Sequence, residues 1–141
     1  MGAGVTIEVF GVDTLKKKLQ TVAQARRIRQ AVAEGTALVE LTAKKLCPRD
    51  TGNLASSIHM DMDTNEPIGV VYTSCEYAPY VEFGTGVAGE RSGYEKAGEL
   101  GLSYASYWAG QVAQPFMLPA LKQNKMRIKA LIDNAVRKEI R

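Results

Sequence analysis

The chain has 141 residues, of which 45% are hydrophobic and 23% charged, and its formal net charge is +3. These values are typical of a soluble globular protein, and the length predicts one domain spanning residues 1–141 around a single core. No apolar run approaches the ~20 residues that a membrane-spanning helix needs, so we expect no membrane association.

The chain contains two cysteines, Cys47 and Cys75, and one histidine. This set excludes a recognisable zinc site. The start of the chain lacks the basic and apolar regions of a signal peptide, so we expect assembly in the cytoplasm. There we expect reduced, partly buried thiols instead of a disulfide, and no cofactor or metal.

The charges are unevenly distributed along the sequence. Residues 14–33 contain six bases and no acid, residues 122–141 have a net charge of +5, and residues 50–112 have a net charge of −7. Such asymmetry is typical of complementary edges that meet head to tail, or of a basic rim near nucleic acid; the alternative is solvated helix faces. The bases considered for a DNA channel or a subunit contact are Lys16, Lys17, Lys18, Arg26, Arg27 and Arg29.

The first predicted element is a strand, because apolar residues recur at every second position from Val5 to Val9. Asp13 is suited to cap a short helix that follows. A second apolar stripe is out of phase with that helix, which places a break near 21–24 and predicts a longer helix over about 25–46. Pro48 ends this helix, because its ring disfavours the helical region for the preceding residue.

The middle of the chain predicts a hairpin. Asp50-Thr51-Gly52 is a turn signal, since an Asp side chain can accept from the backbone two residues on and Gly tolerates positive φ. Alternation over 58–62 predicts a half-buried strand. Residues 65–67 turn the chain, and 68–74 form the partner strand.

From Gly84 to Gly110 the sequence is rich in glycine and in tyrosine. A loop of about 25 residues is long for a compact domain, and such loops are usually functional or disordered. Its aromatic content is too high for a plain linker, so we predict that residues 87–112 are a mobile or interface loop that orders on contact with neighbouring subunits. After Pro119 an apolar stripe predicts a helix that runs nearly to Arg141.

Two patterns that resemble catalytic or cofactor motifs do not fit the chemistry. Residues 84–89 match the dinucleotide pattern G-x-G-x-x-G, but we expect no helix at these glycines and no βαβ unit, both of which pyrophosphate binding requires. Ser57, His59 and Asp61 alternate on a predicted strand, where neighbours on one face are ~6.6 Å apart, too far to relay a proton. We therefore interpret His59 as a solvent-facing residue.

Glu82 and Phe116 stand out for a different reason. Glu82 lies between apolar residues, so it is either an exposed strand residue or a buried acid with partners. If Glu82 is buried, we expect its carboxylate to accept hydrogen bonds from the backbone of the following Gly-Thr-Gly turn or from Arg49. Phe116, bracketed by Pro115 and Pro119, either clamps the start of the last helix or anchors a neighbouring subunit.

Three motifs occur in fixed order: residues 48–58 (P-R-D-T-G-N-L-A-S-S-I), 77–85 (Y-A-P-Y-V-E-F-G-T) and 115–121 (P-F-M-L-P-A-L). Together they resemble the phage tail-component family typified by gene product ten of a lambdoid coliphage, over roughly residues 12–140. The long segment after Gly86 departs from the family, whose members are often shorter there. The motif residues considered as interface candidates are Asp50, Thr51, Gly52, Leu54, Tyr77, Tyr80, Glu82, Phe83, Gly84, Thr85, Pro115, Phe116 and Pro119.

The resemblance implies an α+β fold, in which a small antiparallel sheet is packed by a long helix from the N-terminal half and by the C-terminal helix. It also implies a structural protein of the virion, with no catalytic residues. Such proteins form a ring in the neck, around the DNA path, that joins the capsid connector to the tail. The expected partners are further copies of the chain, in sixfold or alternatively twelvefold symmetry, a head-closure or connector protein, and a tail terminator or tail tube protein. Contact with DNA would be weak and nonspecific.

Three alternatives remain open. The chain could be a tail terminator that caps the tail tube, since the residues do not separate this role from a neck protein. A nonspecific DNA-binding module would instead use the basic helices and bind duplex DNA tightly in a salt-sensitive way. A small enzyme using Glu82 and the glycine loop would carry a stoichiometric nucleotide or metal.

Overall fold

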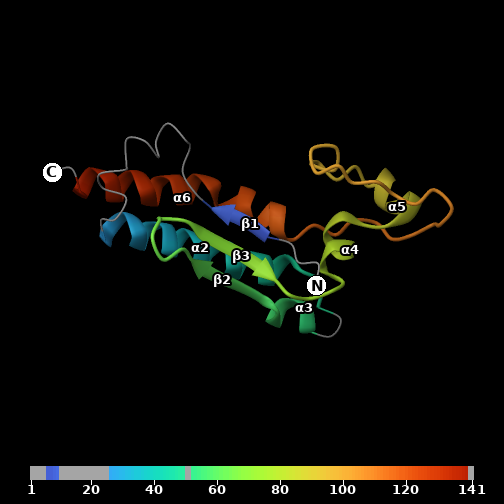
Figure 1. The fold of residues 1–141 in the computed structure, drawn as a ribbon, viewed down its shortest axis with the longest axis horizontal. Coiled ribbons are helices and arrows are strands. Elements are labelled where there is room, and N and C mark those ends of the chain that lie inside the picture. The colour runs from blue at the N-terminus through green and yellow to red at the C-terminus, as the bar shows by residue number, and fades with distance from the viewer. Residues whose placement is uncertain (1–5, 10–25, 50–51, 140–141) are drawn as a thin grey trace.

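A computed structural model describes residues 6–9, 26–49 and 52–139 of the chain. The expected short helix after Asp13, the break at 21–24, and the turn residues Asp50 and Thr51 lie outside this part. The described helices and strands, shown in Figure 1, are in chain order β1 (Thr6–Val9), α2 (Arg26–Leu46), α3 (Asn53–Ser56), β2 (Ile58–Met62), β3 (Gly69–Thr73), α4 (Ala78–Phe83), α5 (Gly86–Arg91) and α6 (Met117–Glu139).

The two long helices, α2 and α6, pack side by side in opposite directions (Figure 1). Near the middle of α2, Gly35 lies against Ile128 of α6, where the missing side chain lets the helices approach closely. Further along, the Asn124 side-chain amide donates to the Thr42 hydroxyl at 2.8 Å. Both helices confirm the predicted stripes, and α2 ends two residues before Pro48.

The described strands form one antiparallel sheet with the order β1-β3-β2. Strands β2 and β3 make the predicted hairpin, in which Ile58 pairs with Thr73 and Met62 with Gly69. Ile58 and Val71 are buried beneath the helices, while His59 and Tyr72 are exposed on the other face. The sheet packed by two helices confirms the α+β fold.

The hairpin loop is held by the start of α2. The Asp63 carboxylate accepts the backbone N–H groups of Asn65 and Glu66, each at 2.8 Å. The Arg29 guanidinium donates to the backbone carbonyls of Asp63 and Glu66. One basic residue of the N-terminal cluster is therefore engaged in fixing this loop within the chain.

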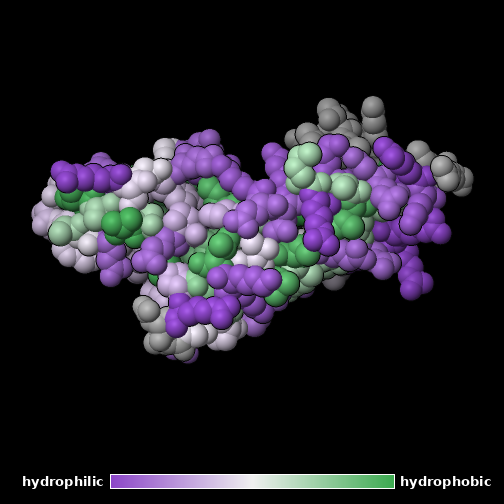
Figure 2. Space-filling model, turned by 180° about the vertical axis from the view of Figure 1, so that it is seen from behind, coloured by the Kyte–Doolittle hydropathy of each residue, from purple (hydrophilic) through white to green (hydrophobic). Residues whose placement is uncertain are grey.

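Between α4 and α6 the chain leaves the helix and sheet body as an arm, residues 84–114, which projects to one side (Figure 1). The two ends of the arm pair through an antiparallel bridge between Thr85 and Gln111. The sequence pattern predicted a loop without helix here, but α5 begins in it at Gly86. Hydrophobic and hydrophilic residues are mixed on the arm's surface, at the left of Figure 2.

Candidate functional site

The second motif folds as the short helix α4, with Tyr77 before its first residue and Pro79 in its first turn. Proline fits there because the first N–H groups of a helix have no partner within the helix. Gly84 ends the helix with φ +75°, a conformation that favours glycine. The interpretation of Glu82 as an exposed strand residue is therefore wrong, because it lies on the inner face of a helix and is 0% exposed.

The Glu82 carboxylate joins the second motif to the third. One oxygen accepts the backbone N–H groups of Phe116 at 2.7 Å and Met117 at 3.0 Å, and the other accepts that of Leu118 at 3.1 Å. These N–H groups at the start of α6 have no carbonyl partner within the helix. The next residue, Pro119, has no N–H. The carboxylate thus completes the first turn of α6 and is placed favourably for the helix dipole.

This arrangement corrects the expected partners of Glu82. The prediction that a buried Glu82 accepts backbone N–H groups is confirmed, but the donors come from residues 116–118 and not from the Gly-Thr-Gly turn. Arg49 is exposed at the end of α2. The error arose because the local sequence around Glu82 gives no sign of a partner more than 30 residues away.

Tyr94 supplies a further bond to Glu82 from the arm. Its hydroxyl donates to the Glu82 carboxylate at 3.2 Å, and its ring meets Phe83 edge to face, with the centroids 4.9 Å apart. Burial raises the pKa of Tyr94 well above its usual range, and the negative charge of Glu82 adds to the effect. Tyr104 also contacts the root of the arm by donating to the Phe83 carbonyl at 2.9 Å. Sequence reasoning missed both tyrosines, because a Gly-rich loop shows no periodicity.

The remaining motif residues divide into buried and exposed sets. Phe116 is fully buried in the core with Leu54 of the first motif, so within this chain its side chain clamps the start of α6. Gly52 has φ +73° just before α3, as the turn signal requires. Tyr77 and Tyr80 are exposed and remain available for contacts with other proteins.

The glycines of the G-x-G-x-x-G pattern serve close backbone packing. A helix does begin at Gly86, contrary to the prediction, but it spans only six residues and follows α4 instead of a strand. Gly86 has φ +59°, and a Cβ there would lie 2.4 Å from the Trp108 carbonyl oxygen. The returning half of the arm therefore occupies the space beside these glycines that a pyrophosphate would need.

The prediction that Ser57, His59 and Asp61 share one strand is wrong for Ser57, which lies before β2 and shares a hydrogen bond of 2.6 Å with Thr73. His59 and Asp61 lie on the strand and are exposed, as predicted for His59. Cys47 and Cys75 are free thiols, the first buried and the second half-buried, as predicted. The described residues contain no group of three or more His, Cys, Asp and Glu side chains arranged to hold a metal.

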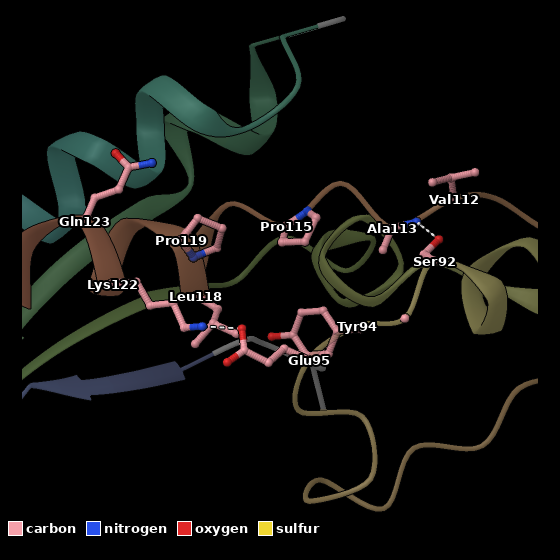
Figure 3. Close-up of a pocket in the computed structure, with 11 residues that line it drawn as sticks. Ser92, Tyr94, Glu95, Val112, Ala113, Pro115, Leu118, Pro119, Lys122 and Gln123 are labelled. Atoms are coloured by element: carbon pink, nitrogen blue, oxygen red, sulfur yellow. Dashed lines mark hydrogen bonds and ion pairs between the residues drawn. The ribbon is translucent and has the colours of Figure 1, made fainter.

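A groove of about 450 Å³ lies where the arm meets α6 (Figure 3). Its walls come from two segments of the arm, residues 92–95 and 112–113, and from Pro115 and the first turns of α6 at 118–123. Most of its side chains are apolar or uncharged. Its two charged residues, Glu95 and Lys122, pair with each other, and this pairing lowers the pKa of Glu95. Sequence reasoning had no means to find the groove, because it depends on the arm folding back.

The proposed basic cluster is only partly described. Lys16, Lys17 and Lys18 lie outside the described residues. Arg26 and Arg27 are exposed at the start of α2, and Arg27 donates to the Lys138 carbonyl at 3.2 Å.

In the described part of the chain, no helix is both long enough and apolar enough to cross a membrane.

Residues 13–84 match the family described as "Bacteriophage HK97-gp10, putative tail-component". This match covers just over half of the chain and includes the first motif and all but the last residue of the second, so the chain belongs to this family of bacteriophage tail components. The match ends at Gly84, where the arm begins. No curated protein and no solved structure is significantly similar to the chain.

Proposed function

We propose that this tail component is a structural protein of the phage neck, where copies form a ring that joins the capsid connector to the tail around the DNA channel. The observation that carries the proposal is the arm, which extends from the body and exposes Tyr107 and Trp108 at 92% and 55%. Contiguous exposed aromatic residues are typical of protein contact sites. A protein that joins the capsid connector to the tail needs such a contact surface.

The distribution of charge supports a ring. Residues 50–112 have a net charge of −7, whereas residues 122–141 have +5. The hairpin contributes Asp61, Asp63 and Glu66 and no base, so the acidic hairpin of one copy complements the basic α6 of another. Two different surfaces that meet in this way form a heterologous interface, which closes into a ring when the rotation per copy allows it. Tail symmetry favours six copies, with twelve as the alternative.

The ring would meet other proteins on its two sides. Its partners would be a head-closure or connector protein on one side and a tail terminator or tail tube protein on the other. Bases such as Arg26 and Arg27 near the channel would act on DNA phosphates without reading sequence. We expect this contact to be weak, because tight binding would hinder DNA passage.

The decisive experiment is negative-stain imaging of lysates from cells infected by phage that lacks this protein. We expect full heads and tails of normal length to accumulate unjoined, and complementation in trans to restore joined particles. Tails of irregular length would indicate a tail terminator instead, since an uncapped tube continues to grow. Joined particles in normal number would contradict both roles.

A nonspecific DNA-binding module is tested separately with the purified chain. It predicts tight binding to duplex DNA, with an affinity that falls steeply as salt increases. For the ring protein we expect weak binding even at low salt.

A further inference from the structure

The far end of the arm is uncharged as well as exposed. No Asp, Glu, Lys or Arg occurs from Leu100 to Leu121, although 23% of the whole chain is charged. Within this run Tyr107 and Trp108 are exposed on the returning half of the arm, where the Trp108 carbonyl accepts the backbone N–H of Val87. We call residues 105–109 the arm tip.

The groove at the root of the arm is apolar and has no net charge, like the arm tip. Val112, Pro115, Leu118 and Pro119 give it an apolar lining, and the ion pair between Glu95 and Lys122 leaves it without an uncompensated charge (Figure 3). An uncharged aromatic tip can enter such a groove without leaving a buried charge unpaired, which would be costly. Aromatic anchors that fill a pocket on the partner are the usual centres of binding energy at protein interfaces.

We propose that the arm tip of one copy docks into the groove at the arm root of the next copy. This inference rests on the proposed ring, and it names the contact that closes it. Tip and groove are different surfaces of the same chain, so each copy offers one of each and the contact can repeat around a ring. The occupant of the groove is thus a second copy and not a head or tail protein.

The surface area that this contact would bury is small, so the contact is weak in isolation. Two aromatic side chains bury roughly 300–500 Å² together. A stable interface buries about 800 Å² on each partner. The tip alone therefore supplies about half of what a stable dimer requires. We expect the purified chain to be monomeric and the contact to form only when neighbours are held side by side in the particle.

Site-directed cross-linking in virions tests the contact. Two singly substituted chains are co-expressed, one with Tyr107→Cys at the tip and one with Gln123→Cys on the groove wall, both in a Cys75→Ser background. We expect a short bismaleimide to produce dimers of this chain. The matched control replaces Gln123→Cys by Asn134→Cys, an exposed position near the other end of α6, and should give none. No dimer with Gln123→Cys, equal dimer with both variants, or linkage of the tip to another virion protein would overturn the proposal.

Substitutions in the groove give an independent test. Val112→Asp places a carboxylate in the lining, whereas Met126→Asp changes a similarly exposed residue on α6 outside it; their exposed fractions are 61% and 77%. Both monomers should keep the melting temperature of the parent chain. We expect loss of incorporation into particles for Val112→Asp alone. Normal incorporation of Val112→Asp would contradict the inference.

The two proposals can fail separately. If heads and tails join normally without this protein but the tip still cross-links to the groove in virions, the contact exists elsewhere in the tail. If heads and tails accumulate unjoined but the cross-link goes to a different protein, the neck role stands and the tip has another partner.

Discussion

The Glu82 carboxylate and the Phe116 backbone N–H lie 2.7 Å apart, although 34 positions separate them in sequence. This bond and those to Met117 and Leu118 make the second and third motifs one structural unit, an acid on α4 and the helix start that it caps. The whole arm lies between the two residues. Its root is therefore fixed to the start of α6 by a buried, charge-assisted contact.

Glu82→Gln should destabilise the protein by about 1–3 kcal/mol, because the amide can accept with one oxygen only and directs its NH₂ group at backbone donors. The measurement is urea unfolding of the purified chain at neutral pH. Glu76→Gln is the control, since Glu76 is exposed beside the same helix. If both variants unfold at the same urea concentration, the carboxylate does not hold α6.

Tyr94 should make the fold sensitive to alkaline pH. Its pKa is raised above the ordinary value of 10.0 by burial and by the charge of Glu82. The folded state therefore favours the neutral phenol. This contribution is complete below pH ~10 and is lost as the pH rises toward the higher folded pKa.

Spectrophotometric titration checks this expectation. Burial also raises the pKa of Tyr104, so two tyrosines of the native protein should ionise later than the other four, and Tyr94→Phe should remove one of these late steps. The same variant should lose about 1 kcal/mol of stability at neutral pH through the missing hydrogen bond. If both late steps persist in Tyr94→Phe, the pKa of Tyr94 is not raised and the prediction is wrong.

Gly86→Ala should distort the arm where the start of α5 contacts the arm tip. Gly86 has a φ of +59°, and the added Cβ would lie 2.4 Å from the Trp108 carbonyl oxygen. The segment of the arm that contains Trp108 must therefore move. Gly98→Ala, which meets nothing within 4 Å, is the control. We expect faster protease cleavage of the arm in the first variant only. Equal cleavage of the two would show that the close approach is not required.

The Asp63 carboxylate should stabilise the fold at neutral pH and lose this effect in acid. The N–H groups of Glu66 and Asn65 lower its pKa below the ordinary value of 3.8. The contribution is therefore present above that value and is lost as the pH falls through the lowered pKa. Asp63→Ala should unfold at lower urea than the parent at pH 7, and the difference should shrink in acid. A difference that is constant with pH would mean that the carboxylate charge is not the cause.

Limited proteolysis should distinguish the free arm from the docked one. Arg91 and Lys96 are exposed trypsin sites within it. We expect cleavage there in the purified chain and protection in virions, where neighbours cover the arm. Similar cleavage rates in both states would contradict a role for residues 87–112 in assembly.

The elements with clear periodicity could be predicted from sequence. The stripe of α2, the alternation of β2 and the breaking effect of Pro48 each reflect a local rule, and the structure places all three as expected. The α+β arrangement followed from the resemblance and is confirmed. These features depend on neighbours within a few residues.

The site was harder to predict because it depends on contacts between distant segments. Sequence alone showed that Glu82 needed partners if buried, but the partners are at residues 116–118. Residues 84–89 were expected to lack a helix, since six residues of Gly, Val, Ala and Thr give no apolar stripe. Tyr94 and the groove arise only when the arm folds back, and no local pattern encodes that.

The pairing of Thr85 with Gln111 brings the start and finish of the arm together. A segment whose two ends are adjacent can vary in length without moving the residues on either side of it, provided that Tyr94 and Tyr104 keep their contacts with α4. The family match stops at Gly84, immediately before this point. Grafting the arm onto a relative with a shorter one would therefore transfer the tip, whereas the α6 wall of the groove would remain that of the recipient.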